Sequence, residues 1–119
     1  MDLGMNADQE AIKDVFASFF IEQTGPESAR NSIPLGFDPK AWKRISETGA
    51  PGMGISPPAG GGASLSDLVI VAEEAGSQIA PLPIIDHVVA SRVLEKLDLL
   101  EEEVLTGTLI AGLVLRPIE

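Results

Sequence analysis

The sequence predicts an all-α fold of about five helices in a small up-and-down bundle, with a lone strand-like segment at the C-terminal end. Three observations predict this fold. Apolar residues recur three and four positions apart in several segments, which is the spacing of one helix face. Capping residues precede these segments, and glycine or proline follows them. With 119 residues, 45% of them hydrophobic, the chain is long enough for one domain with a buried core.

The first predicted helix follows Asn6, whose side chain can form a capping box with Gln9 three positions later. Its apolar stripe consists of Ile12, Val15, Phe16, Phe19 and Phe20. Gly25 and Pro26 stop the growth of a helix, so this one ends before them. We expect an irregular connection over residues 24–37.

The second predicted helix begins with Asp38 as its cap and Pro39 at its first position. Its inward-facing residues are Ala41, Trp42 and Ile45, and we expect the lone tryptophan to be buried. Gly49 ends the helix in the left-handed conformation that glycine adopts without strain. Residues 50–62 then form a loop, which its prolines should keep extended.

The third predicted helix starts at Ser64 and Asp67, which have the spacing of a capping box. Its apolar positions are Leu65, Leu68, Val69, Ala72, Ala75 and Ile79. The segment "APLP" at residues 80–83 ends it, and a fourth helix runs over about residues 84–97. The apolar positions of this fourth helix are Ile85, Val88, Val89, Val93, Leu94 and Leu97.

The fifth predicted helix is "DLLEEEVLTG", residues 98–107, with three glutamates in its first turn, where the helix dipole favours negative charge. Gly107 ends it. The following segment, "TLIAGLVLRPIE", is a continuous apolar run that we interpret as a buried strand. An unpaired strand exposes its backbone groups. The sequence therefore indicates a further part of the protein after residue 119.

Composition excludes several function classes. The net charge is −10 with only eight basic residues, whereas nucleic-acid binding needs clustered cations. The one local basic group, Lys40, Lys43 and Arg44, is interpreted as a solvated helix face. No apolar stretch reaches the length of a membrane span, and the N-terminus lacks the pattern of a secretory signal. With no cysteine, we expect a cytoplasmic protein.

Three glycines precede the third helix in "SPPAGGGASLSDL", where they could cradle a phosphate or form a plain turn. The stretch lacks the lysine of a P-loop, and Pro57 takes the third glycine position of the dinucleotide pattern that Gly52 and Gly54 begin. We therefore predict a structural turn. His87 is the only histidine, which excludes a His-rich metal site and argues against a Ser-His-Asp triad. We expect it to be partly exposed and not catalytic.

The ordered set "MNADQEAIKDVFASFF", "GFDPKAWKRISETGAPGMGISPPAGGGASLSDLVIVAEEAG" and "GTLIAGLVL" resembles the N-terminal helical domain of the acyl-CoA dehydrogenase family. Its most specific part is the loop of prolines and glycines before "DLVIVAEEAG", which is similar to the family's P-E-x-Y-G-G-x-G loop and following helix. The loop departs from that pattern at Ala59, where an aromatic residue or histidine is usual, and in its uninterrupted glycines.

The resemblance implies a flavoprotein oxidoreductase of lipid metabolism and fatty acid β-oxidation, which uses FAD to remove two hydrogens from the α and β carbons of an acyl-CoA. In the family the glutamate base lies in the C-terminal helical domain and the flavin contacts lie in the middle β domain. Residues 1–108 would then be the N-terminal domain, and residues 109–119 the start of an absent middle domain. No catalytic, flavin-binding or metal-binding residue is expected in this chain. We expect FAD and acyl-CoA only in an oligomeric protein completed by the missing domains or a partner subunit.

By the same resemblance the domain lines one wall of the acyl pocket. The positions expected to face the acyl chain are Gly60, Gly61, Leu82, Ile84 and His87, with ordinary packing or solvent exposure as the alternative for each. A second function class stays open. In it, the chain is a non-catalytic acidic helical interaction module that keeps the fold without the flavin chemistry.

Overall fold

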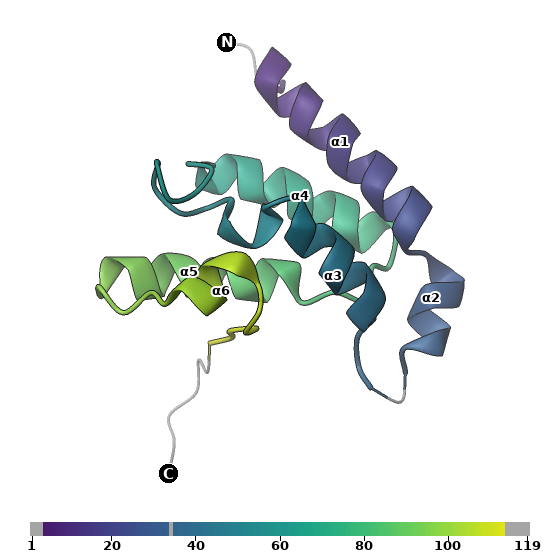
Figure 1. Cartoon of the computed structure of the whole chain (residues 1–119). Coiled ribbons are helices and arrows are strands. Elements are labelled where there is room, and N and C mark those ends of the chain that lie inside the picture. The colour runs from purple at the N-terminus through teal and green to yellow at the C-terminus, as the bar shows by residue number, and fades with distance from the viewer. Residues whose placement is uncertain (1–3, 34, 114–119) are drawn as a thin grey trace. The chain divides into compact units, whose positions relative to one another are not determined.

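The computed structural model describes residues 4–33 and 35–113, which contain helices and no strand (Figure 1). The α-helices are α1 (Ala7–Gln23), α2 (Pro26–Asn31), α3 (Pro39–Glu47), α4 (Leu65–Ser77), α5 (Ile84–Lys96) and α6 (Glu102–Thr106), and η1 (Ala50–Gly52) is a 3-10 helix. The all-α fold class is confirmed. The strand predicted at the C-terminal end is absent from residues 108–113, and residues 114–119 of that prediction lie outside the described residues.

The chain forms two compact units, which we describe separately. The first consists of the residues up to Lys43 together with Ser64–Leu82, and the second consists of Arg44–Ala63 together with the residues from Pro83 onward. None of the helices in the described part of the chain is both long and apolar enough to cross a membrane.

In the first unit, α1 packs against α4 (Figure 1). Phe20 is fully buried, and its ring makes an edge-on contact with Phe19 at a centroid distance of 5.6 Å. Helix α4 buries Leu68, Ile70 and Val71, whereas Leu65, Val69 and Ile79 of the predicted stripe are exposed. The inward face of this helix was thus predicted wrongly at those three positions.

Both α1 and α4 begin with the predicted capping boxes. The Asn6 side chain accepts from the Gln9 N–H at 2.8 Å, and the Ser64 hydroxyl accepts from the Asp67 N–H at 3.2 Å. The Gln9 amide also donates to the Asp67 carboxylate at 3.4 Å, which joins the two boxes. The pKa of Asp67 is lowered, chiefly because the Ser64 N–H donates to its carboxylate.

We expect Ser64→Ala to lower the free energy of unfolding by about 1 kcal/mol, because it leaves the Asp67 N–H without its capping acceptor. Urea denaturation followed by circular dichroism measures this loss. Ser66→Ala, an exposed serine of the same helix, is the matched control and should change stability by less than about 0.5 kcal/mol. Equal effects of the two substitutions would contradict a capping role for Ser64.

The irregular connection predicted over residues 24–37 is wrong in part, because Pro26–Asn31 form α2. Pro26 occupies a first-turn position of this helix, where its missing N–H costs nothing. Asp38 caps α3 as predicted, since its carboxylate accepts from the N–H groups of Lys40 at 3.0 Å and Ala41 at 3.2 Å. Trp42 is 7% exposed, which confirms the predicted burial.

In the second unit, η1 contacts both α5 and α6. Gly49 and Gly107 have φ values of +85° and +84°, so Gly49 has the predicted left-handed conformation, and Gly107, which ends its helix as predicted, shares it. The buried face of α5 consists of Ile84, His87, Val88, Ala90 and Ser91. The sequence predicted a face rotated by about one residue, and Val89 and Val93 of that prediction are exposed.

Candidate functional site

Residues 52–63, here called the Pro-Gly loop, fold back on themselves. The Gly61 N–H donates to Gly52 O at 3.2 Å, and the N–H groups of Gly62 and Ala63 donate to carbonyls of residues 55 and 53, each at 2.8 Å. The extended conformation predicted for residues 50–62 is therefore wrong. The Gly60 N–H also donates within the loop, to Ser56 O at 3.2 Å. Because these four amides are engaged internally, the loop is a structural turn and offers no cradle for a phosphate group.

Gly60 is the glycine of this loop at which an added side chain would make the shortest contacts. A Cβ atom there would lie 2.5 Å from Ile55 Cβ and closer still to Gly52 O. Gly61 is exposed, and a Cβ atom on it would meet Met53 O at 3.2 Å. The absence of side chains thus lets the two arms of the loop lie directly on each other, with the backbone at Gly61 on the surface.

Two charged side chains of α5 contact the Pro-Gly loop, and neither was identified from the sequence. Arg92 Nη1 donates to Gly54 O at 3.4 Å and to Ala63 O at 3.2 Å. The Glu95 carboxylate accepts from the Ser56 N–H at 3.0 Å and from the Ser56 hydroxyl at 3.2 Å. The sequence gives only a weak signal for Arg92 and Glu95, because they reach the loop through contacts between residues far apart in the chain.

His87 is fully buried, so the expectation of a partly exposed side chain is wrong. The Ala111 N–H donates to its Nδ1 at 3.1 Å, and its Nε2 lies 2.8 Å from Val104 O. A backbone N–H can only donate, so Nδ1 is the acceptor and the proton of the neutral ring is on Nε2. Burial lowers the pKa of His87, against a smaller opposing effect of the Val104 carbonyl. The ring therefore links α5 to α6 and to the segment that follows it.

Four of the five predicted wall residues belong to one unit. Gly60 and Gly61 lie in the Pro-Gly loop, and Ile84 and His87 lie in the interior of the same unit. Leu82, which is half-buried, belongs to the other unit. Within their unit, the two glycines are the predicted wall residues with surface available to a ligand.

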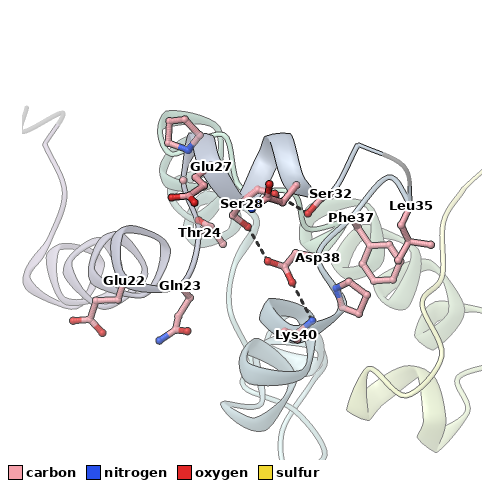
Figure 2. A pocket seen from close by; sticks show the side chains of 14 residues that line it. Glu22, Gln23, Thr24, Glu27, Ser28, Ser32, Leu35, Phe37, Asp38 and Lys40 are labelled. Atoms are coloured by element: carbon pink, nitrogen blue, oxygen red, sulfur yellow. Dashed lines mark hydrogen bonds between the residues drawn. The ribbon is translucent and has the colours of Figure 1, made fainter.

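A pocket of about 800 Å³ lies in the first unit, between the end of α1, α2 and the start of α3. Figure 2 shows Ser28 and Lys40 on either side of Asp38, with Leu35 and Phe37 at one end. The Ser28 hydroxyl donates to Asp38 at 2.7 Å, and the hydroxyls of Thr24 and Ser32 donate to backbone carbonyls. The hydrogen bond from Ser28 to Asp38 joins α2 to the cap of α3, whereas the other two hydroxyls donate within the ends of their own helices. None of the predicted wall residues lines this pocket.

Metal and phosphate groups can be compared with the described side chains and with the amides of the Pro-Gly loop. No group of three or more His, Asp or Glu side chains in residues 4–33 and 35–113 could hold a metal ion. The loop amides that could have met a phosphate of FAD donate to carbonyls of the loop itself. The Pro-Gly loop can therefore contribute shape to a site, but these amides offer no cradle for a phosphate group.

Comparisons with known proteins agree with the resemblance seen in the sequence. Residues 6–97 match the family described as acyl-CoA dehydrogenase, N-terminal domain. The chain is also similar to acyl-CoA dehydrogenase IpdE2 of Mycolicibacterium smegmatis, at 29% identity over an alignment 119 residues long that covers 95% of the chain and 38% of that relative. No solved structure matches the chain significantly. The chain thus spans well under half the length of the curated relative it matches.

Proposed function

Because the chain belongs to the acyl-CoA dehydrogenase family, we propose that it is the N-terminal part of an FAD-dependent enzyme that dehydrogenates an acyl-CoA between its α and β carbons. The observation that carries this proposal is the family match over residues 6–97. The all-α fold and the Pro-Gly loop before α4 support it. We place the enzyme in the cytoplasm and in fatty acid β-oxidation.

In this proposal residues 1–108 form the helical domain, and residues 109–119 begin a middle β domain carried by the rest of the protein or by a partner subunit in an oligomer. The exposure of Leu109, Ile110 and Leu113, which is 52% for Leu109, supports a neighbour on this segment. The match to only 38% of the relative's length also fits a protein with further domains.

The contribution of this chain to the site is one wall of the acyl pocket. We propose that the backbone at Gly60 and Gly61 faces the acyl chain, and that half-buried Leu82 adds apolar surface. We propose a supporting place behind such a wall for Ile84 and His87, and their burial supports this. One open wall leaves most of a ligand in water, so this chain alone should bind acyl-CoA weakly.

The test is flavin content. We expect the 119-residue chain to purify colourless and to show no acyl-CoA dehydrogenation, because the amides of its Pro-Gly loop donate within the loop and offer no phosphate cradle. Joined to the middle and C-terminal domains, or to the subunit that carries them, it should show flavin absorbance that bleaches on adding acyl-CoA. Absorbance spectra before and after acyl-CoA addition give both readouts.

The non-catalytic interaction module is the second candidate function, and it is supported by the departure at Ala59, which lies exposed in the loop. In that case no added domain or subunit restores bleaching, although a partner still co-purifies with the chain. FAD that stays with the isolated chain at one per molecule would contradict both proposals.

A further inference from the structure

We propose that Arg92 and Glu95 are positioning residues that hold the Pro-Gly loop in place as a fixed wall for the acyl chain. The part of this inference that concerns substrate binding rests on the proposed function. We use the word clamp for the hydrogen bonds that Arg92 and Glu95 make to the Pro-Gly loop. All of these hydrogen bonds lie within the second unit. The two residues are three positions apart on α5, so their side chains leave the same side of the helix.

Arg92 joins the two arms of the loop. Its Nη1 donates to the carbonyl of Gly54 in the first arm and to the carbonyl of Ala63 in the second, at 3.4 and 3.2 Å. A guanidinium presents several hydrogen-bond donors in one plane. One side chain therefore closes the base of the loop and would oppose separation of its arms.

Glu95 fixes the point where the first arm turns into the two prolines. Its carboxylate accepts both the N–H and the hydroxyl of Ser56, which is the residue directly before Pro57. Hydrogen bonds with a charged partner are stronger than those between neutral groups. The loop is thus held to α5 at three points, namely Gly54, Ser56 and Ala63.

Packing contacts connect the part of the loop held by α5 to the proposed wall at Gly60 and Gly61. A Cβ atom on Gly54 would lie 3.1 Å from both Arg92 Cδ and Val88 Cγ1, so the first arm rests directly on α5. Gly60 in turn lies against Ile55 of that arm, and the Gly61 N–H donates to Gly52 O. Movement of the first arm away from α5 would therefore move the two glycines that we place at the acyl chain.

A loop rich in glycine loses much backbone entropy when it is ordered, so it needs such tethers to hold one conformation. A wall that discriminates between acyl groups must be fixed before the substrate arrives, because loop ordering on binding would weaken affinity. The geometry therefore assigns Arg92 and Glu95 to substrate binding through the loop, with no part in the chemical step.

The first test uses the complete 119-residue chain and needs no activity. We expect Arg92→Met to speed hydrogen exchange at the amides of Gly61, Gly62 and Ala63 about tenfold, as measured by NMR. Glu95→Ala should also speed hydrogen exchange at these amides, because it removes the contacts to Ser56. The inference can therefore still be tested if one of the two variants fails to fold. Arg92→Lys should restore part of the protection. Lys96→Met, which removes an exposed cation from the same helix, is the matched control.

The second test uses the protein completed with its flavin-binding domains. We expect Arg92→Met to raise KM for acyl-CoA about tenfold while the rate of flavin reduction at saturating substrate changes less than about twofold. Unchanged amide exchange in both Arg92→Met and Glu95→Ala would overturn the clamp, and this result would not depend on the proposed function. Faster exchange with unchanged KM would show a real clamp on a loop that is no acyl wall, which overturns the positioning role. Loss of flavin reduction at unchanged KM would also overturn it.

Discussion

Replacing Trp42 by alanine is expected to lower the free energy of unfolding by about 3–5 kcal/mol. The indole is 7% exposed, and it lies on the same helix as Ala41, which is fully buried. Removing it takes away a large apolar contact area and leaves a cavity that the unit can close only in part. A domain of this size has a total stability of about 5–15 kcal/mol, so the substitution removes a large share of it.

Urea denaturation followed by far-UV circular dichroism measures this effect, because the variant lacks the tryptophan that fluorescence would need. Trp42→Phe keeps an aromatic ring at the site and should cost clearly less than the alanine variant. Lys43→Ala, at the exposed position next to it, is the surface control and should stay within about 0.5 kcal/mol. A loss below about 1 kcal/mol for Trp42→Ala would place the indole at the surface in solution.

The helix boundaries that the sequence predicted correctly depend on residues close together in the chain. Asn6 and Ser64 cap their helices through partners three residues away, and Asp38 caps α3 through the next turn. Gly49 and Gly107 end helices because a left-handed residue is needed at one position. Such features follow from local sterics and hydrogen bonding, so a few residues are enough to predict them.

Helix α2 was missed although it obeys the same local rules. Gly25 and Pro26 were interpreted only as the end of the preceding helix, yet proline is equally suited to the first turn of a new one. Six residues are too few for hydrophobic periodicity to be recognised. The contact that ties this helix down, from Ser28 to Asp38, spans 10 residues and is not a periodic signal.

The inward face of α5 was misplaced because two of its buried residues are polar. Ser91 is buried with its hydroxyl donating to His87 O at 2.7 Å, and His87 is buried with both ring nitrogens close to backbone partners. A pattern based on apolar residues skips such positions and rotates the predicted face. Their hydrogen bonds remove the usual cost of burying polar groups, and sequence periodicity does not report them.

The candidate site was only partly predictable for a related reason. The composition of the Pro-Gly loop predicts a turn, but the loop also has contacts with Arg92 and Glu95 of α5. The hydrogen bond between Ser56 and Glu95 joins residues 39 apart in the chain. No local rule relates residues at that separation. The contacts of Arg92 and Glu95 with the loop therefore follow from the tertiary structure and could not be predicted from the sequence.

The stability of the chain is expected to fall as the pH decreases from about 7.5 to about 5.5, and His87 should account for a measurable part of that fall. Burial lowers the pKa of this side chain in the folded state. Below the ordinary histidine pKa of about 6.5, the unfolded chain binds a proton that the folded chain resists. The contribution of neutral His87 is therefore complete above that pH and is lost as the pH falls toward the folded pKa.

His87→Ala isolates this contribution, because His87 is the only histidine in the chain. We expect the variant to lose about 2–4 kcal/mol at neutral pH, from the cavity and from the unpartnered carbonyl of buried Val104. It should also show a smaller loss of stability between pH 7.5 and 5.5 than the parent chain, as urea denaturation at each pH would reveal. His87→Gln places an amide donor near the Val104 carbonyl without a titrating group, so it should recover part of the stability and keep the weaker pH dependence.

An alanine variant with the full pH dependence of the parent would show that groups other than His87 cause that dependence. Protonation of Nδ1 would set two donors, the ring N–H and the Ala111 N–H, against each other, and this conflict is the physical reason to expect the folded state to resist the proton.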